Sequence, residues 1–221
     1  MSRPTNRWFI LAVALALTSC RLSAEVIDFD DIDASAGDVI LDTLSPYQGF
    51  TWTNFSVYTS TPGFPGFNNG IVSAPNAAYT SGDSLGSPIV STITAPSPFN
   101  FVSGYFGSGW YDGLSVTLNG LYNGAQEFTQ TITVDTEGAQ LFTFNFTGID
   151  ELDIFSTVTG ATSDPYGCGA AGCSQVTLDN LTLTPGNSPP TSVPEPETLA
   201  LTGLGILAFA AFRRLRPTRK S

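Results

Sequence analysis

Between Arg21 and Arg213 the chain contains no lysine, arginine or histidine. All eight basic residues lie in the two end segments, whereas all nineteen Asp and Glu residues lie between Glu25 and Glu197. The formal net charge of −11 therefore understates the separation of charge along the chain. The middle of the protein is a polyanion, and its surface attracts cations.

This charge pattern excludes several classes of function. Nucleic-acid binding needs basic side chains to replace condensed counterions, so we expect no nucleic-acid partner. Catalysis by a Ser/His/Asp or Cys/His arrangement is excluded because the chain has no histidine. A glycoside hydrolase needs only two carboxylates, but no motif singles out such a pair. We therefore expect a protein that is not an enzyme.

The N-terminal segment 1–24 has the features of a secretory signal peptide. Arg3 and Arg7 precede ten apolar residues, Trp8 to Leu17, which are too few to span a membrane. We expect export by the Sec machinery and cleavage by signal peptidase after Ala24. In the alternative, Leu17-Thr18-Ser19-Cys20 resembles a bacterial lipobox, and Cys20 would then be lipidated and become the first residue.

Two further cysteines, Cys168 and Cys173, lie close together in the sequence YGCGAAGC. In an exported protein this pair predicts a disulfide worth about 2 kcal/mol. A zinc site would need two more ligands, and the spacing differs from the C-x-x-C redox motif.

The segment between Val26 and Leu183 shows strand patterns and no convincing 3.6-residue apolar period. Apolar side chains alternate in GLSVTLNG, EFTQTITV and LFTFNF, and Pro-Gly and Asn-Gly turn signals lie between the strand candidates. The other candidates are VIDFDDI, QGFTWTNFSVY, SPIVSTIT, FNFVSGYFGS, ELDIFSTV and SQVTLDNLTL. We predict an all-β domain at 25–184, an antiparallel β-sandwich of jelly-roll type.

The last strand candidate changes its apolar phase. Val176 and Leu178 alternate regularly, but the next apolar pair, Leu181 and Leu183, is shifted by one residue. A β-bulge near Asp179-Asn180 is needed to keep both pairs in the core.

The sequence DFDDID brings Asp28, Asp30, Asp31 and Asp33 into six residues. Two carboxylates about 5 Å apart repel by roughly 3 kcal/mol at an effective dielectric constant of about 20. The segment has no basic residue to relieve this repulsion. Calcium can relieve it, because this cation takes about six to eight oxygen ligands.

This acidic segment and the last-strand sequence LDNLTL resemble the paired terminal strands of calcium-stabilised, carbohydrate-binding-type jelly rolls. In that family a structural calcium often bridges the two strands, away from the ligand cleft. The resemblance implies Asp28 or Asp30 as first-strand ligands and Asp179 as the last-strand ligand. In the alternative, DFDDID is a solvated acidic edge and Asp179 is a turn residue.

Carbohydrate binding would require exposed aromatic rings that stack on sugars. Trp110 and Tyr111 lie in the Gly-rich sequence YFGSGWYDG, which predicts a loop, so they are the candidate stacking residues. A structural role for Trp110 is the alternative. Trp52 alternates with Phe50 on a strand, and we expect it in the core.

The C-terminal segments predict a membrane anchor. A Pro-rich linker at 185–197 precedes fifteen mostly apolar residues at 198–212. As a helix these would extend roughly 22 Å, shorter than the ~30 Å hydrocarbon core, so the bilayer would thin locally. The basic tail at 213–221, which begins with Arg213 and Arg214, predicts a cytoplasmic end. The domain would then lie on the outer side of the membrane, attached to a single membrane-spanning helix.

Val193-Pro194-Glu195-Pro196, the apolar segment and the Arg-rich end together resemble the PEP-CTERM sorting signal of Gram-negative bacteria. The resemblance implies that the membrane protease exosortase cuts at or near Pro-Glu-Pro. The protein would then be released or transferred to the cell surface or to extracellular polysaccharide. A plain C-terminal anchor is the alternative, but it gives no reason for the Val-Pro-Glu-Pro sequence.

Taken together, these features predict an exported protein, first anchored in the inner membrane and then held at the cell surface or in an extracellular matrix. We expect a structural or adhesive role. A calcium-stabilised carbohydrate-binding module is the alternative, and a glycoside hydrolase is a weaker one.

Overall fold

The computed structural model describes residues 25–81, 88–168 and 173–187. The predicted signal peptide (1–24), membrane-spanning helix (198–212) and basic tail (213–221) lie outside the described residues, as do Cys20 and the Val193–Pro196 motif. In the ranges that are described, no helix is long and apolar enough to cross a bilayer.

The described residues form strands joined by turns, with very little helix. The strands are β1 (Glu25–Ile27), β2 (Val39–Ile40), β3 (Thr51–Thr53), β4 (Phe55–Thr59), β5 (Asn76–Thr80), β6 (Ser91–Ser108), β7 (Leu114–Tyr122), β8 (Ala125–Val134), β9 (Gln140–Thr157) and β10 (Val176–Pro185). The helical elements are the six-residue α1 (Pro65–Gly70) and the 3-10 turn η1 (Leu41–Leu44). Strand pairing is antiparallel throughout, which confirms the predicted all-β antiparallel class.

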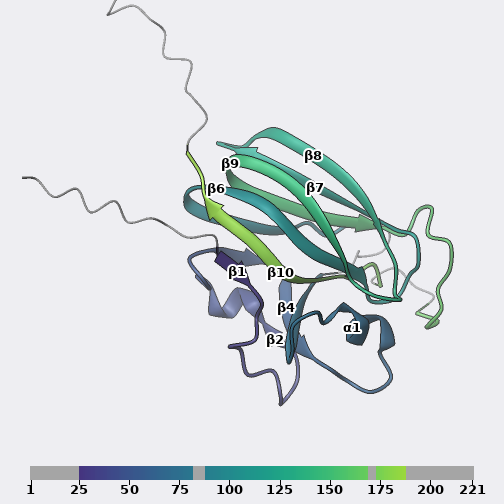
Figure 1. Ribbon diagram of the computed structural model, residues 1–221. Coiled ribbons are helices and arrows are strands. Elements are labelled where there is room, and N and C mark those ends of the chain that lie inside the picture. The colour runs from purple at the N-terminus through teal and green to yellow at the C-terminus, as the bar shows by residue number, and fades with distance from the viewer. Residues whose placement is uncertain (1–24, 82–87, 169–172, 188–221) are drawn as a thin grey trace, which may run out of the picture.

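Two long strands, β6 and β9, each contribute to both layers of the fold. In the first layer, 91–94 of β6 pairs with β3 and with the second half of β9, which in turn pairs with β7 of the β7–β8 hairpin. In the second layer, 99–108 of β6 lies between β10 and the first half of β9, and β5, β4 and β2 continue outward from β10. Figure 1 shows β7, β8 and β9 on one side of the molecule and β2, β4 and α1 on the other.

The passage of β6 between the layers occurs at 95–98. Thr94 pairs with Glu151 and Phe99 pairs with Ile149, so four residues of β6 lie opposite the single residue Asp150. Two of these four are proline, which has no N–H to donate to a neighbouring strand. The sequence does not predict that 91–94 and 99–108 belong to one strand, because apolar residues alternate separately in each half.

A single apolar core fills the space between the layers. Leu114, Val116 and Leu118 of β7 are fully buried, as their alternation predicts. They belong to the same cluster as the phenylalanines of the second layer, of which Phe101 and Phe144 stack with ring centroids 4.8 Å apart. Trp52 is 1% exposed, which confirms its expected place in the core.

Strand β10 contains the predicted bulge. Its register against β6 shifts between Asp179 and Thr182, and Asn180 has a positive φ of 50°. The bulge brings both apolar pairs into the core: Val176, Leu178, Leu181 and Leu183 are at most 1% exposed. The short β1 pairs with β10 just beyond the bulge, so the two ends of the described domain lie side by side (Figure 1).

Candidate functional site

A pocket of about 330 Å³ opens on the side of the molecule that carries α1. Its lining comes from β4, β5 and α1 and from four connections: the residue before β2, the residues before α1, the turn after β6 and the residue before β10. The lining residues are Asp38, Tyr58, Thr61, Phe64, Phe67, Tyr79, Trp110 and Gln175. The pocket is therefore mainly aromatic.

Phe67 of α1 lies at the centre of the aromatic lining. Its ring meets those of Tyr58, Tyr79 and Trp110 edge to face, with centroid separations of 5.4, 5.5 and 5.8 Å. Phe64 also meets Trp110 edge to face at 5.7 Å, and 41% of Phe64 is exposed. Because neighbouring rings are nearly perpendicular, the pocket presents both edges and faces of aromatic rings to a ligand.

Hydrogen bonds to residues outside the helix hold α1 in this position. The Tyr58 hydroxyl donates to the Phe67 carbonyl oxygen at 2.6 Å. Asn68 and Thr61 exchange two hydrogen bonds, in which the Asn68 Nδ2 donates to the Thr61 carbonyl and the Thr61 N–H donates to Asn68 Oδ1. The Asn69 Nδ2 donates to the Thr136 carbonyl at 2.9 Å, which ties the helix to the β8–β9 connection.

Close approach between α1 and the end of β6 depends on two glycines. A Cβ atom on Gly66 would lie 2.8 Å from the Ser108 carbonyl oxygen and even closer to the carbonyl of Gly109. A Cβ atom on Gly109 would lie 2.5 Å from the Phe67 ring. Both positions therefore need a residue without a side chain for Phe67 and Trp110 to meet.

The polar groups of the pocket include a hydrogen-bonded pair of a phenol and a carboxylate. The Tyr79 hydroxyl donates to Asp38 Oδ2 at 2.8 Å. Burial, together with this hydrogen bond, raises the pKa of Tyr79 to about 12, so the phenol keeps its proton at neutral pH. Gln175 Oε1 is buried and accepts no hydrogen bond from the residues the structure describes.

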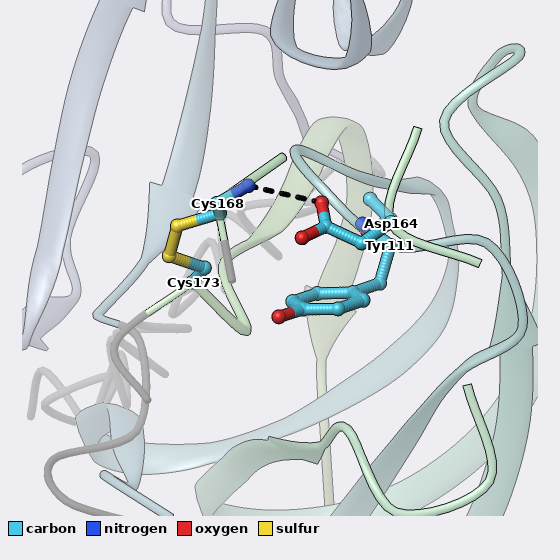
Figure 2. The surroundings of a disulfide bond; sticks show 5 residues. Tyr111, Asp164, Cys168 and Cys173 are labelled. Atoms are coloured by element: carbon cyan, nitrogen blue, oxygen red, sulfur yellow. Dashed lines mark hydrogen bonds between the residues drawn. A yellow bond between two sulfur atoms is a disulfide. The ribbon is translucent and has the colours of Figure 1, made fainter. Parts of the chain in front are cut away.

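The two predicted stacking residues point to different places. Trp110 lines the pocket and is half-buried. Tyr111 does not line it; its ring packs against the apolar core, and its N–H donates to Ser108 Oγ. Figure 2 draws Tyr111 in the surroundings of the disulfide. A sugar-stacking role for either residue stays a prediction.

Cys168 and Cys173 form a disulfide in the structure, with their Cα atoms 6.2 Å apart. The Cys168 N–H donates to Asp164 Oδ1 at 3.1 Å, as the dashed line in Figure 2 shows. Both cysteines belong to the connection between β9 and β10, and neither lines the pocket.

Asp179 is fully buried at the β10 bulge and is held by backbone N–H groups. Its Oδ2 accepts hydrogen bonds from the N–H groups of Val72 and Ser73 at 2.7 and 2.8 Å, and its Oδ1 accepts one from the N–H of Asn180 at 2.7 Å. Burial raises the pKa of Asp179 to about 6, although these N–H groups act in the opposite direction.

The other two predicted calcium ligands lie in the turn after β1. Asp28 Oδ1 accepts the N–H of Asp30, and Asp30 Oδ1 accepts the N–H of Asn76. The side-chain amide of Asn76 donates to the carbonyls of Phe29 and Ile32. Backbone N–H groups thus occupy oxygens of all three carboxylates.

These contacts bear on the predicted calcium site. Across 25–81, 88–168 and 173–187, no three Cys, Asp or Glu side chains are grouped so that they could hold a metal ion. As placed, Asp28, Asp30 and Asp179 do not form a calcium-binding set. Calcium binding stays a prediction, which thermal melting with calcium and with a chelator would test.

Of the eight described residues that line the pocket, sequence analysis singles out Trp110 alone. The seven that it does not identify are Asp38, Tyr58, Thr61, Phe64, Phe67, Tyr79 and Gln175. Asp38 and Tyr79 are 41 residues apart, so no local spacing connects them. The available signal is the sequence TPGFPGFNNG at 61–70, in which two phenylalanines lie among Gly, Pro and Asn. Aromatic residues in a segment that cannot form a regular strand are candidates for a binding loop.

No curated protein sequence matches the chain. Similar solved structures include a Stig cyclase from Fischerella sp. TAU, with 14% identity, coverage of 75% of this chain and 100% of that one, and a TM-score of 0.43. TmCBM61 in complex with beta-1,4-galactotriose has 10% identity, coverage of 65% and 92%, and a TM-score of 0.35. CBM28, a carbohydrate-binding module specific for non-crystalline cellulose, has 13% identity, coverage of 63% and 88%, and a TM-score of 0.32.

These similarities concern the fold alone and say nothing of what this chain binds. The match at the C-terminus is of another kind. Residues 192–214 match the PEP-CTERM protein-sorting motif, which confirms the resemblance of the Val193–Pro196 sequence and of the segment that follows it. The motif indicates an exported protein of the kind that exosortase processes.

Proposed function

We propose that this protein is a non-catalytic binding module of the cell surface or extracellular matrix. Exosortase removes its C-terminal segment near Pro194 to Glu197, and the domain at 25–184 then holds a polysaccharide in the aromatic pocket. The observation that carries this proposal is the pocket itself, in which Phe64, Phe67, Trp110, Tyr58 and Tyr79 line one cavity.

The size and lining of the pocket favour a sugar ring. Ligand pockets typically enclose about 300–1,000 Å³, so a cavity of about 330 Å³ suits a small ligand or one unit of a polymer. Aromatic faces bind the apolar C–H faces of sugars, while the carboxylate of Asp38 accepts hydrogen bonds from hydroxyl groups. Phe64 is 41% exposed at the edge of the pocket, so a sugar chain could extend over its ring beyond the bound unit.

The same pocket does not favour hydrolysis. Glycoside hydrolases use two carboxylates about 5–10 Å apart on either side of the scissile bond. Of the described residues that line the pocket, Asp38 alone carries a carboxylate. Since no His or Lys occurs between Arg21 and Arg213, neither residue type can act as general base in place of a second carboxylate.

Isothermal titration against a panel of oligosaccharides tests the binding proposal. Replacing Trp110 with alanine removes a ring from the pocket wall, and we expect affinity to fall by about tenfold. Tyr122→Ala is the matched control, because Tyr122 is a partly exposed aromatic at the far end of the β7–β8 hairpin. Unchanged binding by the Trp110 variant, or no binding by the unaltered protein, would contradict the proposal.

Mass spectrometry of the protein recovered from its own cells tests the sorting proposal separately. We expect an N-terminus at Glu25 and a C-terminus between Pro194 and Glu197. A lipidated Cys20 would show as a longer and heavier N-terminal peptide. A surface species that retains Arg213 and Arg214 would overturn processing by exosortase.

A further inference from the structure

Of the described residues that line the pocket, Asp38 alone carries a charge, and its carboxylate accepts hydrogen bonds. Asp38 is exposed, and only its Oδ2 is engaged, by the Tyr79 hydroxyl. Its Oδ1 takes no hydrogen bond from the described part of the chain. The Tyr58 hydroxyl already donates to the Phe67 carbonyl and the Tyr79 hydroxyl to Asp38, so neither phenol has a proton left for a ligand. A ligand that donates hydrogen bonds therefore fits these groups better than one that accepts them.

The electrostatic surroundings strengthen this preference. The faces of aromatic rings carry negative partial charge and attract cations, most strongly at Trp. Asp38 adds a full negative charge at the rim, and no basic residue occurs in the chain between Arg21 and Arg213 to offset it. A uronic acid or a sulfated sugar would enter against this field, whereas a cationic sugar would be drawn in.

We propose that the pocket binds an amino sugar whose amino group is free and protonated, as in a deacetylated polysaccharide. The ammonium group lies against Asp38, and the sugar ring lies against Trp110 and Phe64. This inference rests on the proposed function, since it names the kind of sugar that the same pocket takes. It goes further in predicting that acetylation of the amino group, which removes the charge, weakens binding.

The experiment compares chitosan oligosaccharides with N-acetylated chitin oligosaccharides of the same length, by isothermal titration at mildly acidic pH. One exposed ion pair together with one cation–π contact corresponds to about a tenfold preference for the deacetylated ligand. We expect this preference to shrink in high salt, because Asp38 is exposed and screening weakens its attraction.

The test variant is Asp38→Asn, which removes the charge and keeps the shape. We expect it to reduce the preference to about twofold, the share left to the aromatic rings. Glu127→Gln is the matched control: it removes the same charge from an exposed position at the hairpin end of β8, and we expect it to retain the preference.

The possible results separate this inference from the proposed function. A tenfold preference that Asp38→Asn abolishes and Glu127→Gln retains supports it. If both oligosaccharides bind equally and Trp110→Ala weakens both, the ammonium inference is overturned while sugar binding stands. If neither binds, the inference is overturned and the wider oligosaccharide panel decides the proposed function. If Trp110→Ala changes nothing, the proposed function falls together with the inference.

Discussion

The β7–β8 hairpin and the connection between β4 and β5 use their polar side chains in opposite ways. In the hairpin, apolar residues face the core and Ser and Thr face outward, where Thr117 and Thr131 lie with their hydroxyl oxygens 3.1 Å apart. The turn residues Asn123 and Gly124 have φ values of 51° and 75°, as a two-residue hairpin turn of type I′ requires. Strand β7 is paired on both sides, with β8 and with β9, so its backbone groups find their partners on neighbouring strands.

The connection at 60–75 has no strand partner for most of its backbone. Polar side chains supply the missing partners: Asn68 bonds to Thr61, and Asp179 accepts the N–H groups of Val72 and Ser73. Buried backbone groups must be paired, so an irregular segment remains folded only through such contacts. The comparison indicates that the hairpin is a scaffold, whereas the connection depends on single side chains and builds the pocket.

The largest expected effect therefore comes from removing Asp179. In Asp179→Ala, the N–H groups of Val72, Ser73 and Asn180 lose their acceptor inside the protein, and we expect the free energy of unfolding to fall by about 3–5 kcal/mol. Urea unfolding followed by tryptophan fluorescence measures this loss.

The hairpin provides the matched control for this substitution. Asp150 also accepts a backbone N–H, that of Asn123 at 3.0 Å, but the contact is exposed to water. We expect Asp150→Ala to cost less than about 1 kcal/mol, because water replaces the carboxylate. Equal losses in the two variants would show that the irregular connection is no more dependent on one side chain than the hairpin is.

A pH effect of the same carboxylate ranks second. Burial raises the pKa of Asp179 from 3.8 to about 6, so between these values the folded state binds more protons than the unfolded state. The free energy of unfolding should therefore fall by about 3 kcal/mol as pH rises from about 4 to about 6. Below and above this window the contribution of Asp179 is constant.

Repulsion among the remaining carboxylates also weakens as pH falls, so the measurement needs paired variants. Asp179→Asn carries no titrating group at the bulge, and we expect its stability to change less across the window than that of the unaltered protein. Asp150→Asn should keep the full dependence. The same pH slope in all three proteins would assign the effect to general charge repulsion instead.

The contrast between the two regions also explains how far sequence reasoning reaches. Alternation identifies β7 and β8 and their inward faces, and the phase shift at Val176 to Leu183 identifies the bulge. Both features are local in sequence. The pocket is not, because it requires Asp38 to meet Tyr79 and Tyr58 to reach Phe67. Trp110 could be singled out from its Gly-rich surroundings, but its neighbour Tyr111 could not be assigned to the core, since a loop has no alternation that shows which side chain turns inward.

The smallest of the three effects tests whether the pocket depends on the close packing of α1. In Gly66→Ala the new methyl group meets the backbone carbonyls of Ser108 and Gly109, which cannot move without disturbing the end of β6. We expect a loss of about 2 kcal/mol in the free energy of unfolding. Because α1 carries Phe67, we also expect sugar binding to weaken by more than this loss of stability alone would cause.

Gly138→Ala is the same substitution in the connection between β8 and β9, where an added Cβ atom would meet nothing within 4 Å. We expect it to change stability by less than about 0.5 kcal/mol and to leave binding unchanged. If Gly66→Ala also left stability and binding unchanged, α1 could move away from β6 at no cost in free energy. The edge-to-face contact of Phe67 with Trp110 would then not determine the shape of the pocket. A Gly66→Ala protein that is less stable and binds sugar less tightly, beside an unaffected Gly138→Ala protein, would tie the binding function to the irregular connection rather than to the sheet.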